Sequence, residues 1–274
     1  EILVRQLSFN EHCNDLKCLE AHVLRHAGDS KASFHAMCVF NMVEAQRLTV
    51  SIDSEHNKNK LYLRRLQNWT PKPATHNPSL IKKLFILAPS RSGKTSLELL
   101  LSKSDKVKPL GEAINIAYDK KFVFNDLFYR DEVDLKTDGF EVVISTRPST
   151  INYVVELYQK LPDCYFIFVD RHLHSVASEI FFKKYQEKNF HSYDKAALIN
   201  YLKFYSQAKD LIITKIQSRT VSLNFEEIIE QPYKVIQKVG AFLSLDLEVQ
   251  EKETIGRRPK LISDYDQYIK YLKL

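Results

Sequence analysis

The stretch between residues 84 and 97 constrains the fold more than any other part of the chain. An apolar run of strand length, Leu84-Phe85-Ile86-Leu87-Ala88, ends at Pro89, and the turn that follows reads Ser90-Arg91-Ser92-Gly93-Lys94-Thr95. A helical pattern of leucines begins directly after the turn. Such a turn points backbone N–H groups at an anion, and the dipole of the following helix favours negative charge there. We therefore predict that this turn binds a phosphate group, with an ordinary strand-to-helix turn as the alternative.

The residues of the turn follow a known phosphate-binding pattern. Ala-x4-Gly-Lys-Thr is a Walker A sequence in which Ala88 replaces the first glycine. A strand before the turn and a helix after it are the context in which this pattern is credible. The candidate ligands of the phosphate are Arg91, Ser92, Gly93, Lys94, Thr95 and Ser96.

Before this turn, the chain has a different character. Apolar residues recur at helical spacing between residues 11 and 67, which predicts two or three antiparallel helices. These helices could be the remnant of a helical repeat. Residues 69–78 are rich in proline and lack periodicity, as a linker does. We expect a helical segment with its linker over residues 1–75 and a main domain over residues 76–274.

After residue 76, strand-like runs alternate with helical patterns. Alternation of this kind predicts an α/β fold: a three-layer parallel sheet of the P-loop nucleotide-binding type, with the N-terminal helical addition. Ligands bind such sheets at the carboxyl ends of the strands, where the phosphate turn, Glu112, Arg147 and Arg171 would all lie. The expected strands are 84–88, 122–125, 141–145, 164–169 and 220–225, and the expected helices are 94–103, 152–160, 175–188, 195–217 and 232–242.

Composition narrows the classes of partner. The net charge of +6 comes from scattered Lys and Arg residues, so an anionic small ligand explains it and nucleic acid is not required. The four cysteines lack the paired C-x-x-C spacing of a zinc site, and we expect no bound metal and a reducing, cytoplasmic location. We find no apolar run long enough to cross a bilayer.

Two kinds of phosphate chemistry fit the turn. The run Tyr165-Phe166-Ile167-Phe168-Val169-Asp170 is an apolar strand that ends in a carboxylate, as a Walker B strand does. A Mg-dependent P-loop kinase or ATPase could therefore use Lys94, Thr95 and Asp170. The second kind of chemistry is indicated by two other segments, Gly111-Glu112 and Asp170-Arg171-His172.

From residue 83 to residue 247 the sequence resembles the sulfotransferases that use 3′-phosphoadenylyl sulfate (PAPS), especially the tyrosyl-protein and tetratricopeptide-associated bacterial branches. Arg91-Ser92-Gly93-Lys94-Thr95 resembles the family's 5′-phosphosulfate loop, usually Arg-Ser-Gly-Thr-Thr. Further matching segments, in the order of the family, are Val107 to Glu112, Phe166 to His172, Leu223 to Pro232 and Val239 to Leu245.

The resemblance implies a role for each matched residue. The enzyme would be a sulfotransferase that moves a sulfuryl group from PAPS to a hydroxyl and releases adenosine 3′,5′-bisphosphate (PAP). Arg91 and Lys94 would stabilise the transferred group, and Glu112 would take the proton of the acceptor. Arg171 and Ser178 would hold the 3′-phosphate, and Arg257 and Arg258 resemble basic residues that fold over the nucleotide.

The sequence also departs from the family's pattern. Leu173 stands where the family has Pro, Glu179 where it has Ser, and Thr146 where it has a basic residue. A degenerate member that binds a nucleotide without catalysis is therefore a further alternative. The acceptor could be a small molecule, a carbohydrate or a peptide, and the helical segment could present a peptide or form a homodimer.

Overall fold

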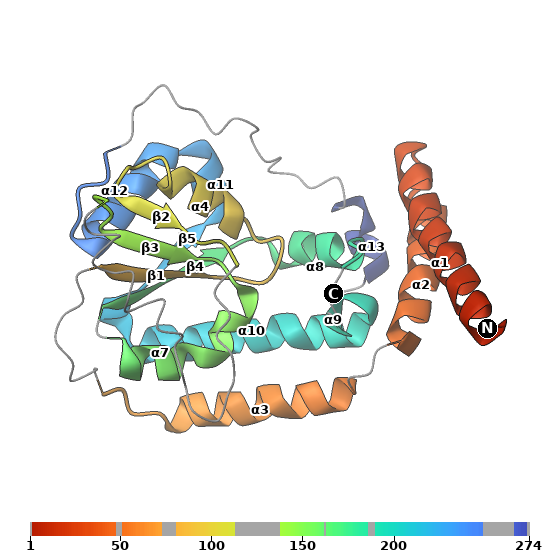
Figure 1. Cartoon of the computed structure of the whole chain (residues 1–274), viewed down its shortest axis with the longest axis horizontal. Helices are drawn as coiled ribbons and strands as arrows, with labels where there is room; N and C mark the ends of the chain where they lie inside the picture. Colours follow the sequence, from red (N-terminus) through yellow and green to blue (C-terminus); the bar gives the residue numbers. More distant parts are fainter. Residues whose placement is uncertain are drawn as a thin grey trace. The chain divides into compact units, whose positions relative to one another are not determined.

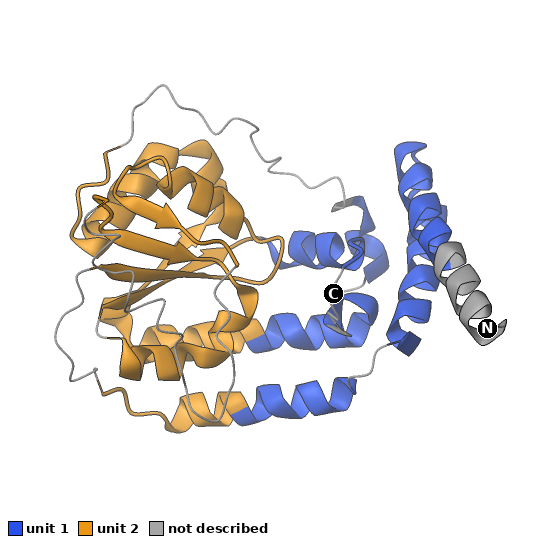
Figure 2. Ribbon diagram, viewed as in Figure 1, with its two compact units in different colours: residues 1–61, 172–204, 262–274 blue, residues 62–171, 205–261 orange. Residues whose placement is uncertain are grey.

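The structure of the chain, a computed structural model, describes residues 2–47, 51–72, 81–112, 138–161, 163–185, 190–248 and 266–272. It divides into two compact units, which Figure 2 colours separately. Unit 1 comprises residues 1–61, 172–204 and 262–274, and unit 2 comprises residues 62–171 and 205–261. The expected boundary near residue 75 lies outside the described residues.

Unit 2 is built on a parallel five-stranded sheet. Its strands lie in the order β2-β3-β1-β4-β5, and every neighbouring pair is parallel. The central strand pairs on both sides, with Phe85 opposite Ser145 on one neighbour and opposite Phe166 on the other. The strands are β1 (Lys82–Leu87), β2 (Val107–Pro109), β3 (Val142–Ser145), β4 (Cys164–Asp170) and β5 (Thr220–Asn224).

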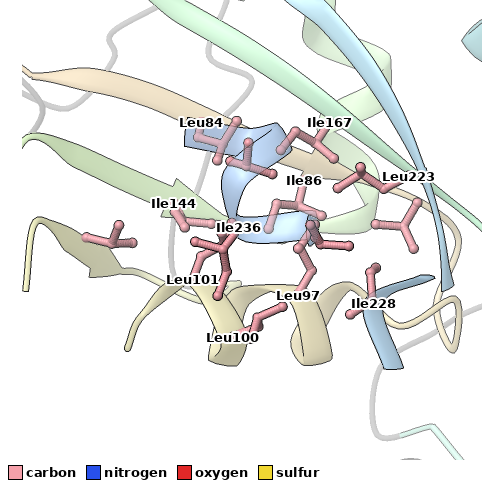
Figure 3. Packing of buried hydrophobic residues seen from close by; sticks show 14 of the residues in the cluster. Leu84, Ile86, Leu97, Leu100, Leu101, Ile144, Ile167, Leu223, Ile228 and Ile236 are labelled. Atoms are coloured by element: carbon pink, nitrogen blue, oxygen red, sulfur yellow. The ribbon is translucent and has the colours of Figure 1, made fainter. Parts of the chain in front are cut away.

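Helices cover both faces of this sheet. In Figure 1, α4 (Lys94–Leu101), α11 (Phe225–Glu230) and α12 (Pro232–Leu243) lie on one side, and α7 (Val154–Lys160) lies on the other with the unit 2 part of α10 (Lys195–Lys215). Figure 3 shows leucines of α4 packed against Leu84 and Ile86 of β1 in the apolar core of the first face. The expected three-layer α/β fold is therefore confirmed. Short 3-10 turns, η1 (Pro148–Tyr153) and η2 (Gln217–Arg219), precede α7 and β5.

Unit 1 is helical and draws on three separate stretches of the chain. Its apolar core joins Met37 and Phe40 of the N-terminal helices to Ile180 of the middle stretch and to Tyr268 near the C-terminus. The Ser33 hydroxyl and the Tyr268 hydroxyl lie 2.8 Å apart. Its elements are α1 (Ile2–His26), α2 (Ser30–Arg47), the first part of α3 (Ile52–Asn68), α8 (Leu173–Phe181), α9 (Phe190–Tyr193), the first part of α10, η3 (Asp266–Tyr268) and α13 (Ile269–Leu272).

Two details differ from the sequence-based expectations, and one expected element cannot be compared. The edge strand β2 has only three residues and includes Pro109, so it lacks the apolar run by which strands are recognised. The helix expected over 175–188 ends at Phe181, where the Lys183 N–H bonds to the Ile180 carbonyl and closes a tighter turn. The strand expected at 122–125 lies outside the described residues. Within the described part of the chain, no helix is long and apolar enough to cross a membrane.

Candidate functional site

The turn predicted to bind phosphate, residues 89–94 and named the phosphate turn for that prediction, lies between β1 and α4, at the carboxyl edge of the sheet. Arg91 and Gly93 both have positive φ angles, +69° and +95°, so the turn coils tightly before the helix begins. A Cβ atom on residue 93 would lie 2.3 Å from the Cδ2 atom of Phe225 in α11. Glycine is therefore required at position 93 by the backbone conformation and by the space available.

Helix α4 begins at Lys94 with Gly93 at its N-cap, and no side chain caps it. The N–H groups of a first helical turn have no carbonyl partner within the helix, so they can serve an anion. The Lys94 side chain is buried, and its Nζ donates to the Pro89 carbonyl at 3.0 Å. Ser92 is also buried, whereas Thr95 is exposed and Ser96 is half-buried. The residues predicted as phosphate ligands thus form one compact turn with a lysine folded across it.

Arg171 joins this turn from the neighbouring strand. It follows the last residue of β4, and its Nη1 donates to the Arg91 carbonyl at 2.7 Å. Its guanidinium also lies over the Phe225 ring, 4.4 Å from the ring centroid. The same ring therefore packs beside Gly93 and supports Arg171, and the structure brings Arg171 together with the phosphate turn.

Asp170, the end of the suspected Walker B strand, is held by a lysine. Lys209 Nζ lies 2.6 Å from one oxygen of the Asp170 carboxylate and 2.7 Å from the other. Sequence reasoning missed Lys209 because residues 170 and 209 are far apart in the chain and α10 carries other lysines without a distinguishing pattern.

Glu112 follows β2 and is exposed. The residue before it, Gly111, has a φ of +59°, and its N–H donates to Glu98 Oε1 at 2.8 Å. The other oxygen of Glu98 lies 3.5 Å from the Thr146 hydroxyl, at the end of β3. Burial raises the pKa of the Glu98 carboxyl, while the Gly111 N–H and the Thr146 hydroxyl act to lower it, and the Glu112 charge adds to the rise.

Sequence reasoning also missed Glu98, although a signal was present. It stands in the run Leu97-Glu98-Leu99-Leu100-Leu101, three residues before Leu101 and therefore on the same side of the helix as that buried leucine. A carboxylate on the buried side of a helix needs hydrogen-bond donors, so its position in this run is the signal.

The remaining predicted residues are not part of this cluster of described contacts. Ser178 belongs to α8 of unit 1, where its side chain is fully buried and its hydroxyl has no hydrogen-bond partner within the described part of the chain. Glu179 is also buried in α8. Arg257 and Arg258 lie outside the described residues.

Comparison with known proteins gives matches of two kinds. A family model described as "Sulfotransferase family" matches residues 122–249. No curated protein matches the sequence. Among solved structures, a sulfotransferase from Alicyclobacillus acidocaldarius is 16% identical, with a TM-score of 0.43, and the match covers 68% of this chain and 89% of that one.

Two other solved structures match in a similar way. The sulfotransferase domain from the curacin biosynthetic pathway is 14% identical, with a TM-score of 0.40 over 64% of this chain and 76% of that one. The mouse sulfotransferase SULT7A1, solved in complex with PAP, is also 14% identical, with a TM-score of 0.39 over 68% of this chain and 65% of that one.

Proposed function

We propose that the chain transfers a sulfuryl group from PAPS to a hydroxyl acceptor. Its match to a sulfotransferase family model over residues 122–249 supports a transferase in general. The donor, the acceptor and the roles of individual residues belong to the proposal. Membership of the tyrosyl-protein or tetratricopeptide-associated branch is not needed for it.

One observation carries the choice of donor. The guanidinium of Arg171 bonds to the backbone of the phosphate turn at Arg91, which supports the proposal that both features bind the anionic groups of one ligand. PAPS carries a 5′-phosphosulfate and a separate 3′-phosphate. The turn from Arg91 to Ser96 would hold the first group through its N–H groups, and Arg171 would grip the second in the fork geometry that guanidinium offers to phosphate. Ser178, Arg257 and Arg258 are further proposed contacts of the nucleotide.

In the proposed reaction, Glu112 is the general base. The acceptor oxygen forms a bond to sulfur as the bond from sulfur to the bridging phosphate oxygen breaks, and the acceptor proton passes to Glu112. Negative charge then grows on the bridging oxygen, and the proposed role of Arg91 and Lys94 is to stabilise it. Glu112 is exposed, so an acceptor hydroxyl can reach it from solvent.

The second candidate is a Mg-dependent P-loop kinase or ATPase that uses Lys94, Thr95 and Asp170. It is favoured by the lysine and threonine of the turn and by the position of Asp170 at the end of β4. Against it, both carboxylate oxygens of Asp170 are within hydrogen-bond distance of the Lys209 ammonium. A metal ion there would have to displace a positive charge that already neutralises the ligand.

Calorimetric titration separates the two candidates. PAP titrated with and without Mg is compared with ATP in the presence of Mg. Binding of PAP that does not depend on the metal supports the sulfotransferase, and binding of ATP only with Mg supports the kinase. Glu112→Gln should leave PAP binding nearly intact while turnover is lost, and equal loss of both would remove Glu112 from the role of base.

The acceptor is open to a labelling test. Radiolabelled PAPS is offered with 4-nitrophenol, a tyrosine peptide and a short glycan, which represent a small molecule, a peptide and a carbohydrate. Transfer of label to one of them supports catalysis. Binding of PAP without transfer to any acceptor would favour the degenerate, non-catalytic member. A cytoplasmic location and a homodimer remain proposals beside this one.

A further inference from the structure

Glu98 is a buried charged side chain of α4 whose contacts reach the segments after β2 and β3. It lies on α4, one helical turn after Lys94, and it is only 7% exposed. Leu97 and Leu101 beside it are fully buried in the apolar core of unit 2. Burial of a carboxyl group costs free energy unless hydrogen-bond donors contact it, so the contacts of Glu98 matter for this part of the fold.

The two oxygens of Glu98 contact the chain after two different strands. Oε1 accepts the Gly111 N–H at 2.8 Å, just after β2, and Oε2 lies 3.5 Å from the Thr146 hydroxyl, just after β3. These two segments also bond to each other, because the Thr146 N–H donates to the Gly111 carbonyl at 3.0 Å. The Glu98 side chain of α4 therefore holds Gly111, the residue before Glu112, by a hydrogen bond.

We propose that Glu98 is a positioning residue of the transfer reaction: its buried carboxyl group holds the Gly111–Glu112 turn against α4, so that Glu112 meets the acceptor hydroxyl in a fixed place. This inference rests on the proposed function, in which Glu112 is the base. The left-handed backbone of Gly111 adds to the need for such a tie, because a glycine turn has many other conformations within reach.

The anchor also links the base to the phosphate turn. Lys94 and Glu98 are four residues apart on α4 and therefore lie on the same side of the helix. Any shift of the helix start would be passed to Gly111 through the Glu98 side chain. The charges of Glu98 and Glu112 also repel each other, which adds to the rise in the pKa of Glu98.

Three variants of the full chain test the proposal. Glu98→Ala removes both contacts, whereas Glu98→Gln keeps an oxygen that can accept the Gly111 N–H. Glu156→Ala is the matched control, because Glu156 is another buried glutamate of unit 2 and it bonds to Arg65 on the covering helix α3. Glu156 is not part of the phosphate turn or of the contacts around Glu112.

Hydrogen exchange of the peptide covering residues 107–112 gives the first readout, which does not require turnover. Glu98→Ala should speed exchange of the Gly111 amide about fivefold to tenfold, the effect of losing one hydrogen bond. Glu98→Gln and Glu156→Ala should leave it near the wild-type rate. Equal exchange in wild type and Glu98→Ala would overturn the proposal.

Kinetics with the acceptor that PAPS labels most strongly give the second readout. Glu98→Ala should lower kcat about 100-fold, as misplacement of a catalytic group by an ångström does, and leave the Kd for PAP unchanged. Glu98→Gln should restore most of kcat. In a Glu112→Gln background, Glu98→Ala should cause no further loss, because its effect acts through Glu112.

Different results would overturn the role of Glu112 as base and the positioning role of Glu98. If Glu112→Gln keeps full turnover, the role of Glu112 as base is wrong and the inference falls with it. If Glu112→Gln loses turnover but Glu98→Ala turns over like wild type, or loses PAP affinity as much as kcat, only the positioning role of Glu98 is overturned.

Discussion

Replacement of Gly93 by alanine tests the packing on which the phosphate turn depends. Gly93 has a φ of +95°, a region that residues with a Cβ atom rarely adopt. The new Cβ would also lie 2.3 Å from Cδ2 and 2.7 Å from Cε2 of Phe225. The ring carries the Arg171 guanidinium on its face, so a movement of Phe225 would disturb the proposed 3′-phosphate contact as well.

The expected loss of stability has two parts. A left-handed conformation costs an alanine about 1–2 kcal/mol, and overpacking against the ring costs about 1–3 kcal/mol. The sum is about 2–5 kcal/mol, which corresponds to a fall in Tm of about 5–15 °C for a protein of this size. Gly139 provides a matched control, because its φ is +90° and no described atom lies within 4 Å of the position of its Cβ. Gly139→Ala should therefore show only the first part.

Chemical denaturation of wild type, Gly93→Ala and Gly139→Ala measures both parts. A Phe225→Leu variant then removes most of the obstructing ring, and in that background Gly93→Ala should cost about 1–3 kcal/mol less. Equal losses for Gly93→Ala and Gly139→Ala, or an unchanged loss after Phe225→Leu, would refute the argument that Phe225 closes the space at Gly93.

Three further predictions concern charges. Arg171→Lys keeps the charge but loses the fork and the stacking on Phe225, so the Kd for PAP measured by calorimetry should rise about tenfold to 100-fold. The control Arg219→Lys alters a similar stack on Tyr165 and should leave the Kd for PAP unchanged. Equal effects of the two variants would count against a specific contact between Arg171 and PAP. Lys209→Met should leave the Asp170 carboxylate without its ammonium partner and weaken PAP binding, most clearly at low salt. Adding Asp170→Asn to this variant should restore PAP binding. If PAP binding does not recover, Lys209 does not act by neutralising Asp170. Burial lowers the pKa of His191 to about 4, below the ~6.5 of an unfolded histidine. Between these two pH values the unfolded state binds more protons than the folded state. The free energy of unfolding should therefore fall by up to about 3 kcal/mol as pH drops from 6.5 to 4. His191→Phe, which can keep the stack on Tyr201, should flatten this dependence, and an unchanged pH profile would assign it to other groups.

The core elements of unit 2 could be predicted because their signals are local. The apolar run before the turn became β1, the leucines after it became α4, and the expected parallel sheet with helices on both faces is confirmed. The resemblance to sulfotransferases was also visible in the sequence, because Arg91-Ser92-Gly93 and the later segments follow the family's order, and a sulfotransferase family model matches residues 122–249. The strand β2 was missed because three residues with a proline carry no periodicity.

The composition of the helical unit could not be predicted in this way. Its core joins residues near positions 37, 180 and 268, and no local pattern indicates that three stretches so far apart would share one core. The predicted roles of Ser178, Glu112, Arg257 and Arg258 remain proposals.

The sequence by itself determined the turn at residues 89–94 and the strand and helix around it, because these depend on residues within a few positions of one another. Only the tertiary structure decided that Arg171 bonds to Arg91, that Phe225 closes the space beside Gly93, that Lys209 holds Asp170 and that Glu98 holds Gly111. Each of these contacts joins residues from different elements, and its existence depends on the order of the strands and the side of the sheet that each helix covers. Those features are set by packing of the whole core, which no short stretch of sequence contains.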